Sequence, residues 1–424
     1  MNPRELLLNS FHAAADAADP LKIVPCHLPT PPQRGNTLVV GAGKAAAAMA
    51  RAVEENWPAD YPLEGIVITP YGHGMATNNI MVIEASHPMP DTQGEMAARA
   101  MLESVRMLTP NDLLLGLFSG GGSSLLSAPI SGITLDELQS ITSQLLRCGA
   151  SIQEINIVRK HLSSVLGGRL AAASRAPVHS LIISDVTDND PSSIASGPCA
   201  PDPSTWQDVL KLIERYAITL SPQSAEILQE RANNSDDETP KPGDSVFRNV
   251  KNRIIATARQ SLTAAAQFFR AQGVTPLILG DTVTGEAREI AKMHAAIARE
   301  VRHYSNPFKP PVVLISGGET TVTVSGNGRG GRNAEFLLSL AMALNGLEEV
   351  YALACDTDGI DGSETNAGAI ITPDTLNRAV HAGIDPITLL DDNNAWTFFN
   401  RLNDLVITQP TRTNVNDYRA ILIL

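Results

Sequence analysis

The stretch TLVVGAGKAAAAMARAVEENWPADYPLEGIVITP, at positions 37–70, decides the fold class. An apolar run ends in a glycine-rich turn, a helical segment follows, and a second apolar run closes the stretch at 65–70. Short runs of Val, Ile and Leu that alternate with amphipathic helices are typical of a parallel sheet covered on both faces. The stretch therefore predicts an α/β fold.

The same alternation continues along the rest of the chain. In the first half it predicts apolar strands at 79–85, 112–122 and 180–185, and helices at 91–108, 134–148, 152–174 and near 204–216. In the second half it predicts a strand in RIIATA with a helix to 272, a strand in PLILGD before the helix GEAREIAKMHAAIAREV, a strand at 310–320, a helix at 333–344, and strands at 350–359 and 420–424.

The segment NNSDDETPKPGDS (233–245) is polar, charged and rich in turn-forming residues. Such a segment between two alternating regions is typical of a domain boundary. A length of 424 residues also favours two domains over one. We therefore expect an N-terminal domain at 1–240 and a C-terminal α/β domain at 246–424.

Composition excludes several classes of protein. The 32 Lys and Arg against 45 Asp and Glu give a net charge of -13 without a basic cluster, which argues against nucleic acid as a partner. No apolar run approaches the roughly 18 residues of a membrane span. The start of the chain lacks the features of a secretory signal, so we expect a cytoplasmic protein. The four cysteines form no C-x-x-C pair, which argues against a zinc knuckle or a disulfide framework.

Three apolar strands end in glycine-rich turns, VVGAGK (39–44), LFSGGGSS (117–124) and LISGGET (314–320). Free backbone N–H groups beside a helix start suit phosphate or carboxylate oxygens, although a single such turn can be purely structural. The first two turns supply the nucleotide-binding candidates Gly41, Gly43, Ser119, Gly120, Gly121, Gly122, Ser123 and Ser124. The third supplies the substrate-binding candidates Gly317, Gly318 and Glu319.

The first turn also fits the dinucleotide pattern G-x-G-x-x-A through Gly41, Gly43 and Ala46. That pattern requires an acidic residue about 20 positions on, at the end of the second strand. Residues 68–71 read Ile-Thr-Pro-Tyr and contain no acid. We therefore interpret Lys44 as a catalytic, anion-binding lysine, with a solvated surface lysine as the alternative. The chain has neither a Walker P-loop nor a G-x-S-x-G elbow.

Two acidic segments follow predicted strands, SDVTDNDPSSIASGP (184–198) and DTDGIDG (356–362). Mg²⁺ prefers one or two carboxylates together with substrate phosphates, and strand-end aspartates commonly supply them. The metal candidates are Asp185, Asp188, Asp356 and Asp358, and Asp185 is also a candidate catalytic residue. The alternative for several of them is a role in Asx turns. Ser196 and Gly197, in a second glycine turn, join the nucleotide-binding candidates.

The segment SGNGRGGRNAEF (325–336) predicts a flexible cationic loop that leads into a helix. Such a loop suits a clamp for a transferring phosphate or a substrate carboxylate, and surface decoration is the alternative. Arg332 is therefore a catalytic candidate, and Arg329 and Asn333 are substrate-binding candidates. Arg159 and Lys160, in a predicted helix, and His87, in SHPMPD, complete the substrate-binding candidates. For His87 a structural role remains an alternative.

Taken together, these segments resemble the glycerate 2-kinase family whose C-terminal part is the MOFRL domain, some members of which are also called hydroxypyruvate reductase. The resemblance rests on ordered stretches from about residue 38 to 418, among them VVGAGKAAAAMA, LFSGGGSSLL, INIVRKHLSSVLGGRLA, SDVTDNDPSSIASGP, ISGGETTVTVSGNGRGGRNAEF, CDTDGIDGSETNAGA and TNVNDY. One departure is clear: the family usually reads TGPTGTNV, whereas this chain reads TQPTRTNV, so Gln409 and Arg412 replace glycines.

The resemblance implies a Rossmann-like N-terminal domain, a smaller C-terminal α/β domain and an active site in the interdomain cleft. It also implies ATP-dependent phosphorylation of D-glycerate to 2-phosphoglycerate with a divalent metal, which we expect to be Mg²⁺. A related hydroxy acid is an alternative substrate. Lys44 and Arg332 match the family's basic residues at the reaction centre. The expected partner is a small-molecule substrate, with neither nucleic acid nor membrane, and a homo-oligomer is left open.

Two other classes of function stay open from the sequence. One is an NAD(P)H-dependent hydroxypyruvate reductase, which the missing acid after the second strand disfavours. The other is a nucleotide- or sugar-acid-binding protein without catalysis, which the density of charged groups beside the glycine turns disfavours. Phosphoryl transfer needs positioning and charge neutralisation more than covalent chemistry, and the glycine turns, cations and aspartates supply both.

Overall fold

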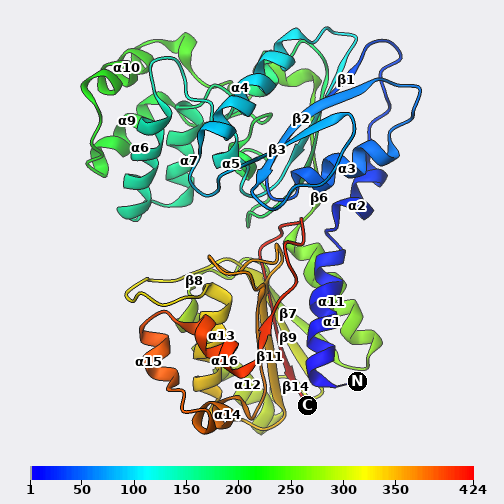
Figure 1. Ribbon diagram of the computed structural model, residues 1–424, viewed down its shortest axis with the longest axis vertical. Coiled ribbons are helices and arrows are strands. Elements are labelled where there is room, and N and C mark those ends of the chain that lie inside the picture. Colours follow the sequence, from blue (N-terminus) through cyan, green and yellow to red (C-terminus); the bar gives the residue numbers. More distant parts are fainter. Residues whose placement is uncertain (1) are drawn as a thin grey trace. The chain divides into compact units, whose positions relative to one another are not determined.

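The computed structural model describes residues 2–424 and divides the chain into two compact units (Figure 1). One unit is Pro20–Ile255, here called the N-terminal unit. The other, the C-terminal unit, consists of Ala256–Leu424 together with the described residues up to Asp19.

The N-terminal unit is built on a six-stranded sheet with the order β3-β2-β1-β4-β5-β6. The strands are β1 (Thr37–Ala42), β2 (Leu63–Pro70), β3 (Ile80–Ala85), β4 (Leu113–Phe118), β5 (Val178–Ile183) and β6 (Val250–Ala256). The pairs β2/β3, β1/β2, β1/β4 and β4/β5 are parallel. This is the strand order of a Rossmann-type sheet, in which ligands bind beyond the carboxyl ends of the strands. The predicted α/β fold is confirmed.

Helices cover both faces of this sheet. On one face α4 (Thr92–Met107) buries Ala97, Met101 and Val105 against Val40 and its neighbours, together with α5 (Gly122–Leu125) and α8 (Arg169–Ala173). On the other face lies α3 (Ala46–Asn56), preceded by α2 (Pro20–Ile23) and η1 (Val24–His27). Small residues dominate α3, so its backbone approaches the strands closely.

A second group of helices forms its own core around the fully buried Trp206. Its members are α6 (Leu135–Arg147), α7 (Ile152–His161), α9 (Trp206–Arg215) and α10 (Pro222–Asn233). The remaining short helices of the unit are η2 (Ile194–Ser196), η3 (Ser235–Asp237) and η4 (Ser245–Asn249). The single helix predicted at 152–174 was wrong: α7 ends at His161, and Gly167 and Gly168 at φ of 60° and 83° turn the chain before α8.

The C-terminal unit contains a mixed sheet with the order β13-β12-β11-β14-β9-β7. The strands are β7 (Thr275–Gly280), β9 (Val312–Gly318), β11 (Val350–Asp356), β12 (Gly368–Ile371), β13 (Leu405–Val406) and β14 (Asp417–Ile423). The last strand, β14, runs antiparallel to both β9 and β11, whereas β7 and β9 are parallel. A separate short parallel pair joins β8 (Gly285–Glu286) and β10 (Thr320–Thr321).

Each face of the mixed sheet has its own hydrophobic core, because successive strand residues point to opposite faces. Ala420 and Leu422 pack with α1 (Pro3–Asp16) and α11 (Ala258–Ala271). Ile421 and Ile423 pack on the other side, against the group α12 (Ala287–Tyr304), α13 (Arg332–Leu344), α14 (Thr375–His381), α15 (Pro386–Asp391) and α16 (Ala395–Leu402). Figure 1 shows the two helix layers on either side of the strands.

The first helix of the chain packs in the C-terminal unit, whereas the sequence had assigned residues 1–240 to one domain. The reason is the apolar face of α1: Leu7, Phe11 and Ala14 are buried against α11 and the mixed sheet. The Oη–H of Tyr418 also donates to Ser10 Oγ at 2.8 Å. In the sequence, the boundary between the two units falls at 255/256 rather than within 233–245, because β6 belongs to the first sheet.

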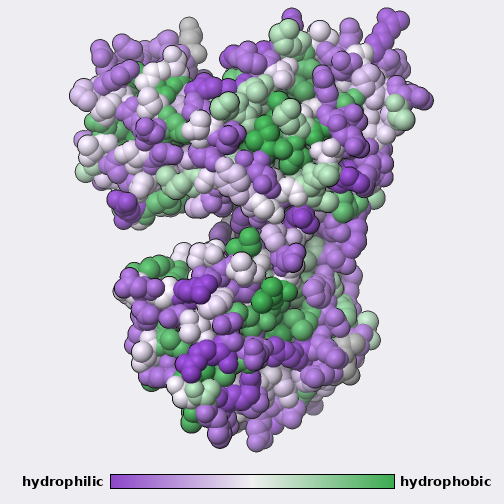
Figure 2. All heavy atoms as spheres, viewed as in Figure 1, coloured by the Kyte–Doolittle hydropathy of each residue, from purple (hydrophilic) through white to green (hydrophobic). Residues whose placement is uncertain are grey.

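Hydrophilic residues cover most of the face of each unit that Figure 2 shows, and hydrophobic residues form separate patches on it. Over residues 2–424, no helix combines the length and apolar character that a membrane span requires.

Phe11→Ala should destabilise the C-terminal unit by about 3–5 kcal/mol, because Phe11 is fully buried and its ring packs on Tyr418. Denaturant unfolding of the purified variant measures this change in free energy. The neighbouring His12→Ala is the matched control, since His12 is exposed. A loss no larger for Phe11→Ala than for His12→Ala would show that α1 is not part of this core.

Candidate active site

The glycine turns after β1 and β4 are joined by direct hydrogen bonds. The backbone N–H of Lys44 donates to the carbonyl oxygen of Gly120 at 2.9 Å. The next N–H, of Ala45, donates to Ser119 Oγ at 3.0 Å. Lys44 is therefore fixed, partly buried, at the carboxyl edge of the parallel sheet, where ligands bind in such folds. We call residues 41–44 and 119–124 the turn cluster.

The glycines of the first turn allow β1 and β4 to approach each other. A Cβ on Gly41 would lie 2.3 Å from the carbonyl oxygen of Leu117, and one on Gly43 would lie 2.2 Å from Ser119 Oγ. Gly43 also has a φ of 133°, which side chains disfavour. Both residues were predicted to bind nucleotide, and strand packing alone already explains why they are glycines.

Gly121 brings two other candidates to the second turn. It adopts a φ of 82°, and a Cβ there would lie 3.1 Å from the His87 ring and 3.5 Å from Lys44 Cγ. The neighbouring Gly122 begins α5, and a Cβ on it would lie 2.6 Å from the Ala195 methyl group. The turn thus passes beside Lys44 and His87, and only a residue without a side chain fits there.

A chain of polar side chains links this turn to η2 and α7. Ser123 Oγ and Ser196 Oγ lie 2.8 Å apart, and Ser196 Oγ donates to Asn156 Oδ1 at 3.2 Å. Ser196 has a φ of 55° and the following Gly197 one of 58°. Left-handed backbone at a non-glycine residue is strained, and such strain is common at functional sites. Sequence analysis did not single out Asn156, because it shows no pattern apart from its helix.

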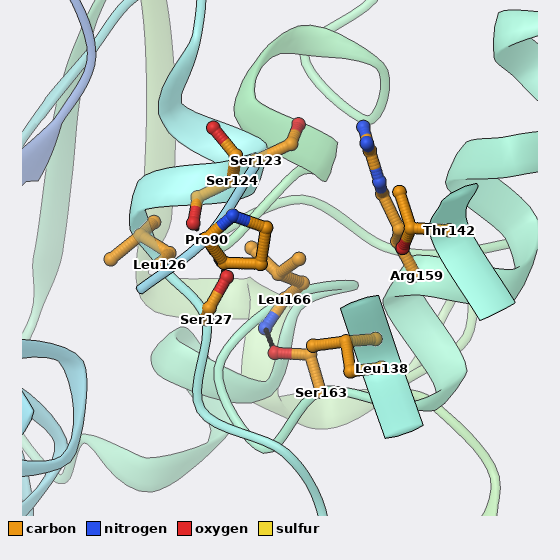
Figure 3. A pocket seen from close by; sticks show the side chains of 10 residues that line it. All are labelled: Pro90, Ser123, Ser124, Leu126, Ser127, Leu138, Thr142, Arg159, Ser163 and Leu166. Carbon is orange, nitrogen blue, oxygen red and sulfur yellow. Dashed lines mark hydrogen bonds between the residues drawn. The ribbon is translucent and has the colours of Figure 1, made fainter. Parts of the chain in front are cut away.

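A small pocket, open to solvent on one side, lies beside the turn cluster (Figure 3). One wall comes from α5 and the loop after it, and the opposite wall from α6 and α7. Its lining is rich in hydroxyl groups and contains one cation: Pro90, Ser123, Ser124, Leu126, Ser127, Leu138, Thr142, Arg159, Ser163 and Leu166. We call it the Arg159 pocket.

The two neighbouring substrate-binding candidates on α7 have different environments. Lys160 is buried and pairs with Asp202, Nζ to Oδ1 at 3.4 Å, and Asp202 also accepts from Thr239 at 3.1 Å. The structure therefore places Lys160 in a buried ion pair, away from the pocket lining. Arg159 instead lines the pocket. Burial lowers the pKa of Arg159.

The acidic segment after β5 is mainly turn-forming. Asp188 Oδ1 accepts from the N–H of Asp190 at 3.2 Å, and Asp190 Oδ1 accepts from the N–H of Ser192 at 2.9 Å. Both carboxylates are exposed. Asp185, partly buried, lies two residues beyond the end of β5 and so at the carboxyl edge of the sheet.

In the C-terminal unit, Arg332 begins α13 and contacts three carboxylates. Its guanidinium donates to Asp417 at 2.9 Å, Asp356 at 2.7 Å and Glu319 at 2.8 Å. Burial alone would lower the pKa of Arg332, but the carboxylates of Asp417, Asp356 and Glu319 raise it well above its usual value. We call these four residues the Arg332 cluster, and its arginine is permanently charged.

Asn333 and Asp361 hold the start of α13. The N–H groups of Asn333 and Ala334 donate to the Asp361 carboxylate at 2.9 and 2.8 Å, and Asn333 Nδ2 donates to Asp417 at 2.7 Å. Asn333 is fully buried. The contacts of this predicted substrate-binding residue are therefore those of a structural side chain.

Asp356 ends β11, and Asp358 lies in the tight turn that follows it. The N–H of Asp358 donates to Asp356 Oδ1 at 3.0 Å, and the N–H of Ile360 donates to Asp358 Oδ1 at 2.8 Å. Both are buried. Within residues 2–424 no group of three or more His, Cys, Asp or Glu residues has the arrangement of a metal site.

The predicted flexible loop is packed along residues 391–396. A Cβ on Gly326 or Gly328 would lie 2.4 Å from Asp392 or Asn394. Arg329 pairs with Glu364, Nε to Oε1 at 3.1 Å, and its guanidinium lies 3.9 Å from the centre of the Trp396 ring. These glycines permit close backbone contact, and the flexibility of the loop stays a prediction.

The third glycine turn also lies in this region. Gly318, at a φ of 108°, approaches the backbone of Val283, and the carbonyl oxygen of Gly317 accepts from Arg419 at 3.4 Å. Arg419 and Asp417, two residues apart on one face of β14, form a buried ion pair. Sequence analysis missed this pair, although charged residues beside the apolar AILIL run were a signal.

The two departures from the family's glycines keep a glycine-like backbone. Gln409 has a φ of 61° and Arg412 one of 59°. Between them, the N–H of Thr411 donates to the carbonyl oxygen of Asp358 at 2.9 Å. The loop therefore follows a left-handed path beside the Asp356–Asp358 turn although both positions carry side chains.

Comparison with known proteins agrees with this architecture. Residues 6–229 match the family described as Domain of unknown function (DUF4147), and residues 312–417 match the MOFRL family. The chain belongs to the glycerate kinase family that combines these two domains. The resemblance inferred from the motifs is confirmed.

Relatives carry two different names. The D-glycerate 2-kinase of Thermotoga maritima is 41% identical over 91% of this chain and 90% of its own length. A protein of Agrobacterium vitis named "Putative hydroxypyruvate reductase" is 48% identical over 100% of this chain and 95% of its own. The crystal structure of a glycerate kinase from Thermotoga maritima matches with a TM-score of 0.87 and 38% identity, covering 99% of both chains.

Asp361 should make the stability of the C-terminal unit depend on pH. Burial raises the pKa of Asp361 from 3.8 to about 6, opposed by the N–H groups of Asn333 and Ala334 and by Arg332, while Asp417 raises it further. The folded state then binds the proton more tightly than the unfolded state. The stabilisation is complete below about pH 4 and is lost as the pH rises through about 6.

We expect the free energy of unfolding of the wild type, minus that of Asp361→Asn, to fall by roughly 1–3 kcal/mol between pH 4 and pH 7. The amide of the variant does not titrate and so serves as the reference. Urea unfolding at a series of pH values measures the difference. A difference that is constant over this range would mean that Asp361 is ionised throughout.

Proposed function

We propose that this protein transfers the γ-phosphoryl group of ATP to D-glycerate and forms 2-phosphoglycerate. Relatives of known name support the proposal: glycerate kinases from Thermotoga maritima and Pyrococcus horikoshii are 41% and 37% identical over more than nine-tenths of the chain. The observation that carries it is the position of Lys44, held by the joined turns of β1 and β4 beside Gly120–Gly122.

Charge neutralisation is the main task of a protein in phosphoryl transfer. Lys44 provides a positive charge next to backbone N–H groups of the second turn, which suits the oxygens of a transferring phosphoryl group. The joined turns fix the backbone from which the Lys44 side chain extends. Ser123 and Ser196, 2.8 Å apart, offer hydroxyl groups at the same end of the sheet.

In the C-terminal unit we assign Arg332, like Lys44, the role of a cation that binds an anionic group. Two of its carboxylate partners, Asp356 and Asp417, are buried, whereas the side chain of Glu319 is 54% exposed. Exposed ion pairs are weak, so Glu319 is the partner that an incoming phosphate or carboxylate replaces at lowest cost. Arg332 then binds the anion while the buried pairs keep its guanidinium in place.

The described residues do not offer a complete set of metal ligands by themselves, so a divalent metal would need phosphate oxygens to complete its coordination. Mg²⁺ takes one or two carboxylates together with phosphate oxygens and water, and it neutralises phosphate charge when bound. Asp185, at the carboxyl edge of the first sheet, is the residue we assign to it. Asp188 is exposed, Asp356 pairs with Arg332, and Asp358 Oδ1 accepts the N–H of Ile360.

A hydroxypyruvate reductase is the second candidate, because a relative at 48% identity carries that name. The end of β2 argues against it. Thr69 Oγ1 donates to the carbonyl oxygen of Gly43 at 3.1 Å, and Pro70 and Tyr71 follow. Two acids lie near this strand end. Glu84 on β3 accepts from the N–H groups of Gly72 and Gly74 at 3.1 and 2.9 Å, and Asp91 accepts from the Tyr71 hydroxyl group at 2.8 Å. Both carboxylates accept hydrogen bonds from the chain itself, and neither stands at the end of β2, where a dinucleotide fold places the acid that binds the ribose.

Purified protein should form ADP when given D-glycerate and Mg-ATP, and EDTA in excess of the metal should abolish the reaction. A coupled assay measures ADP, and NMR of the product identifies the phosphorylated position. In parallel, hydroxypyruvate with NADH or NADPH should give little oxidation of the cofactor. Robust reductase activity without ADP formation would replace the kinase proposal.

Lys44→Ala should lower kcat by at least about 100-fold while the fold persists, because loss of one preorganised charge contact in the transition state costs a few kcal/mol. The control is Lys211→Ala, since Lys211 is exposed on α9 and pairs with Asp208 of its own helix. Circular dichroism verifies folding of both variants. Near-normal turnover of Lys44→Ala would assign Lys44 to the solvated surface.

A further inference from the structure

Arg159 differs from the other cations around it. Lys160 pairs with Asp202, and the guanidinium of Arg169 donates to the carbonyl oxygens of Lys160 and Ser163, both at 2.8 Å. Arg159 has no ion pair and no hydrogen bond with any residue that the structure describes. It nevertheless lies partly buried on the wall of a pocket.

A desolvated cation without a counter-charge is unfavourable in a folded protein. Burial lowers the pKa of Arg159, and no neighbouring carboxylate raises it. The capping box of α7, in which Ser151 and Glu154 bond each other's backbone, fixes the helix that carries it. The cation is therefore held in the pocket wall without compensation from the protein.

The rest of the pocket suits a small polar anion. Its other polar side chains are the hydroxyl groups of Ser123, Ser124, Ser127, Thr142 and Ser163, and no acidic residue lines it. Figure 3 shows Arg159 and Thr142 on one wall, facing the serines of α5 and its loop on the other. Ser124 Oγ and Ser127 Oγ already donate to the carbonyl oxygens of Gly121 and Ser124. The guanidinium of Arg159 and the hydroxyl groups of Thr142 and Ser163 are therefore the donors in the lining that suit a carboxylate.

The pocket adjoins the turn cluster. Ser123 lies two residues after Gly121, the residue next to the Lys44 side chain, and it also lines the pocket. A short hydroxy acid can then place its carboxylate toward Arg159 and its hydroxyl group toward the turn that carries Lys44. We propose that the Arg159 pocket is the subsite for the carboxylate of the acceptor and that Arg159 selects hydroxy acids over neutral polyols.

This assignment rests on the proposed kinase function. The test measures steady-state constants for D-glycerate and for Mg-ATP with Arg159→Gln and Arg159→Lys. In Arg159→Gln the KM for D-glycerate should rise roughly 10- to 100-fold, as expected for loss of a charge-assisted hydrogen bond. The KM for Mg-ATP should stay within about two-fold of the wild type. Arg159→Lys keeps the charge but not the planar fork, so its KM should be intermediate.

The matched control is Arg147→Gln, since Arg147 is exposed at the end of α6 and does not line the pocket. Its constants should equal those of the wild type. An unchanged KM for D-glycerate in both Arg159 variants, or equal increases in the two KM values, would overturn the assignment, because a merely structural role affects both substrates. If the wild type itself does not phosphorylate D-glycerate, the proposed function fails instead, so the two failures are distinguishable.

Discussion

The buried carboxylate of Asp417 is the constraint on which the candidate site of the C-terminal unit depends. It is 1% exposed and lies at the start of β14, where Arg332, Asn333 and Arg419 all bond to it. A buried charge is tolerated only when it is paired and hydrogen-bonded. Asp417 therefore fixes the first residues of α13, and with them the direction of the Arg332 guanidinium.

In the turn cluster of the N-terminal unit, backbone hydrogen bonds rather than a buried charge fix the candidate residues in place. There the fixed elements are backbone groups, with the N–H of Lys44 and of Ala45 bonded to the turn after β4. The glycines between them exclude side chains, so the two strands meet closely at their carboxyl ends. In the N-terminal unit, backbone hydrogen bonds position Lys44, whereas ion pairs with carboxylates position Arg332 in the C-terminal unit.

The features that depend on local sequence patterns could be predicted from the sequence. The strands of both sheets follow apolar runs, and the turn cluster follows from strands that end in glycines, so these features were accessible. The position of α1 was not, because its apolar face is compatible with either core and only the tertiary packing of Phe11 decides. The end of α7 at His161 was missed because the glycines that turn the chain lie several residues later.

For a related reason, the candidate site could be predicted only in part from the sequence. A glycine-rich segment has the same composition whether its glycines provide motion or close packing, and residues 326–331 use them for packing. Likewise Arg159 and Lys160 are adjacent and chemically similar in sequence, yet one lines a pocket and the other pairs with Asp202. The difference depends on Asp202, 42 residues beyond Lys160 in the chain, and no local pattern reports it.

The loop at 408–412 shows how strongly such contacts constrain the chain. Left-handed backbone costs a non-glycine residue roughly 1–2 kcal/mol, and this loop accepts that cost at Gln409 and again at Arg412. A Cβ on Gly359 would lie only 2.2 Å from the carbonyl oxygen of Gln409, so the loop passes close to the turn. The N–H of Thr411 also donates to the carbonyl oxygen of Asp358. Any other path would break these contacts with the Asp356–Asp358 turn. Contacts with the turn that the loop covers therefore offset the cost of left-handed backbone at Gln409 and Arg412.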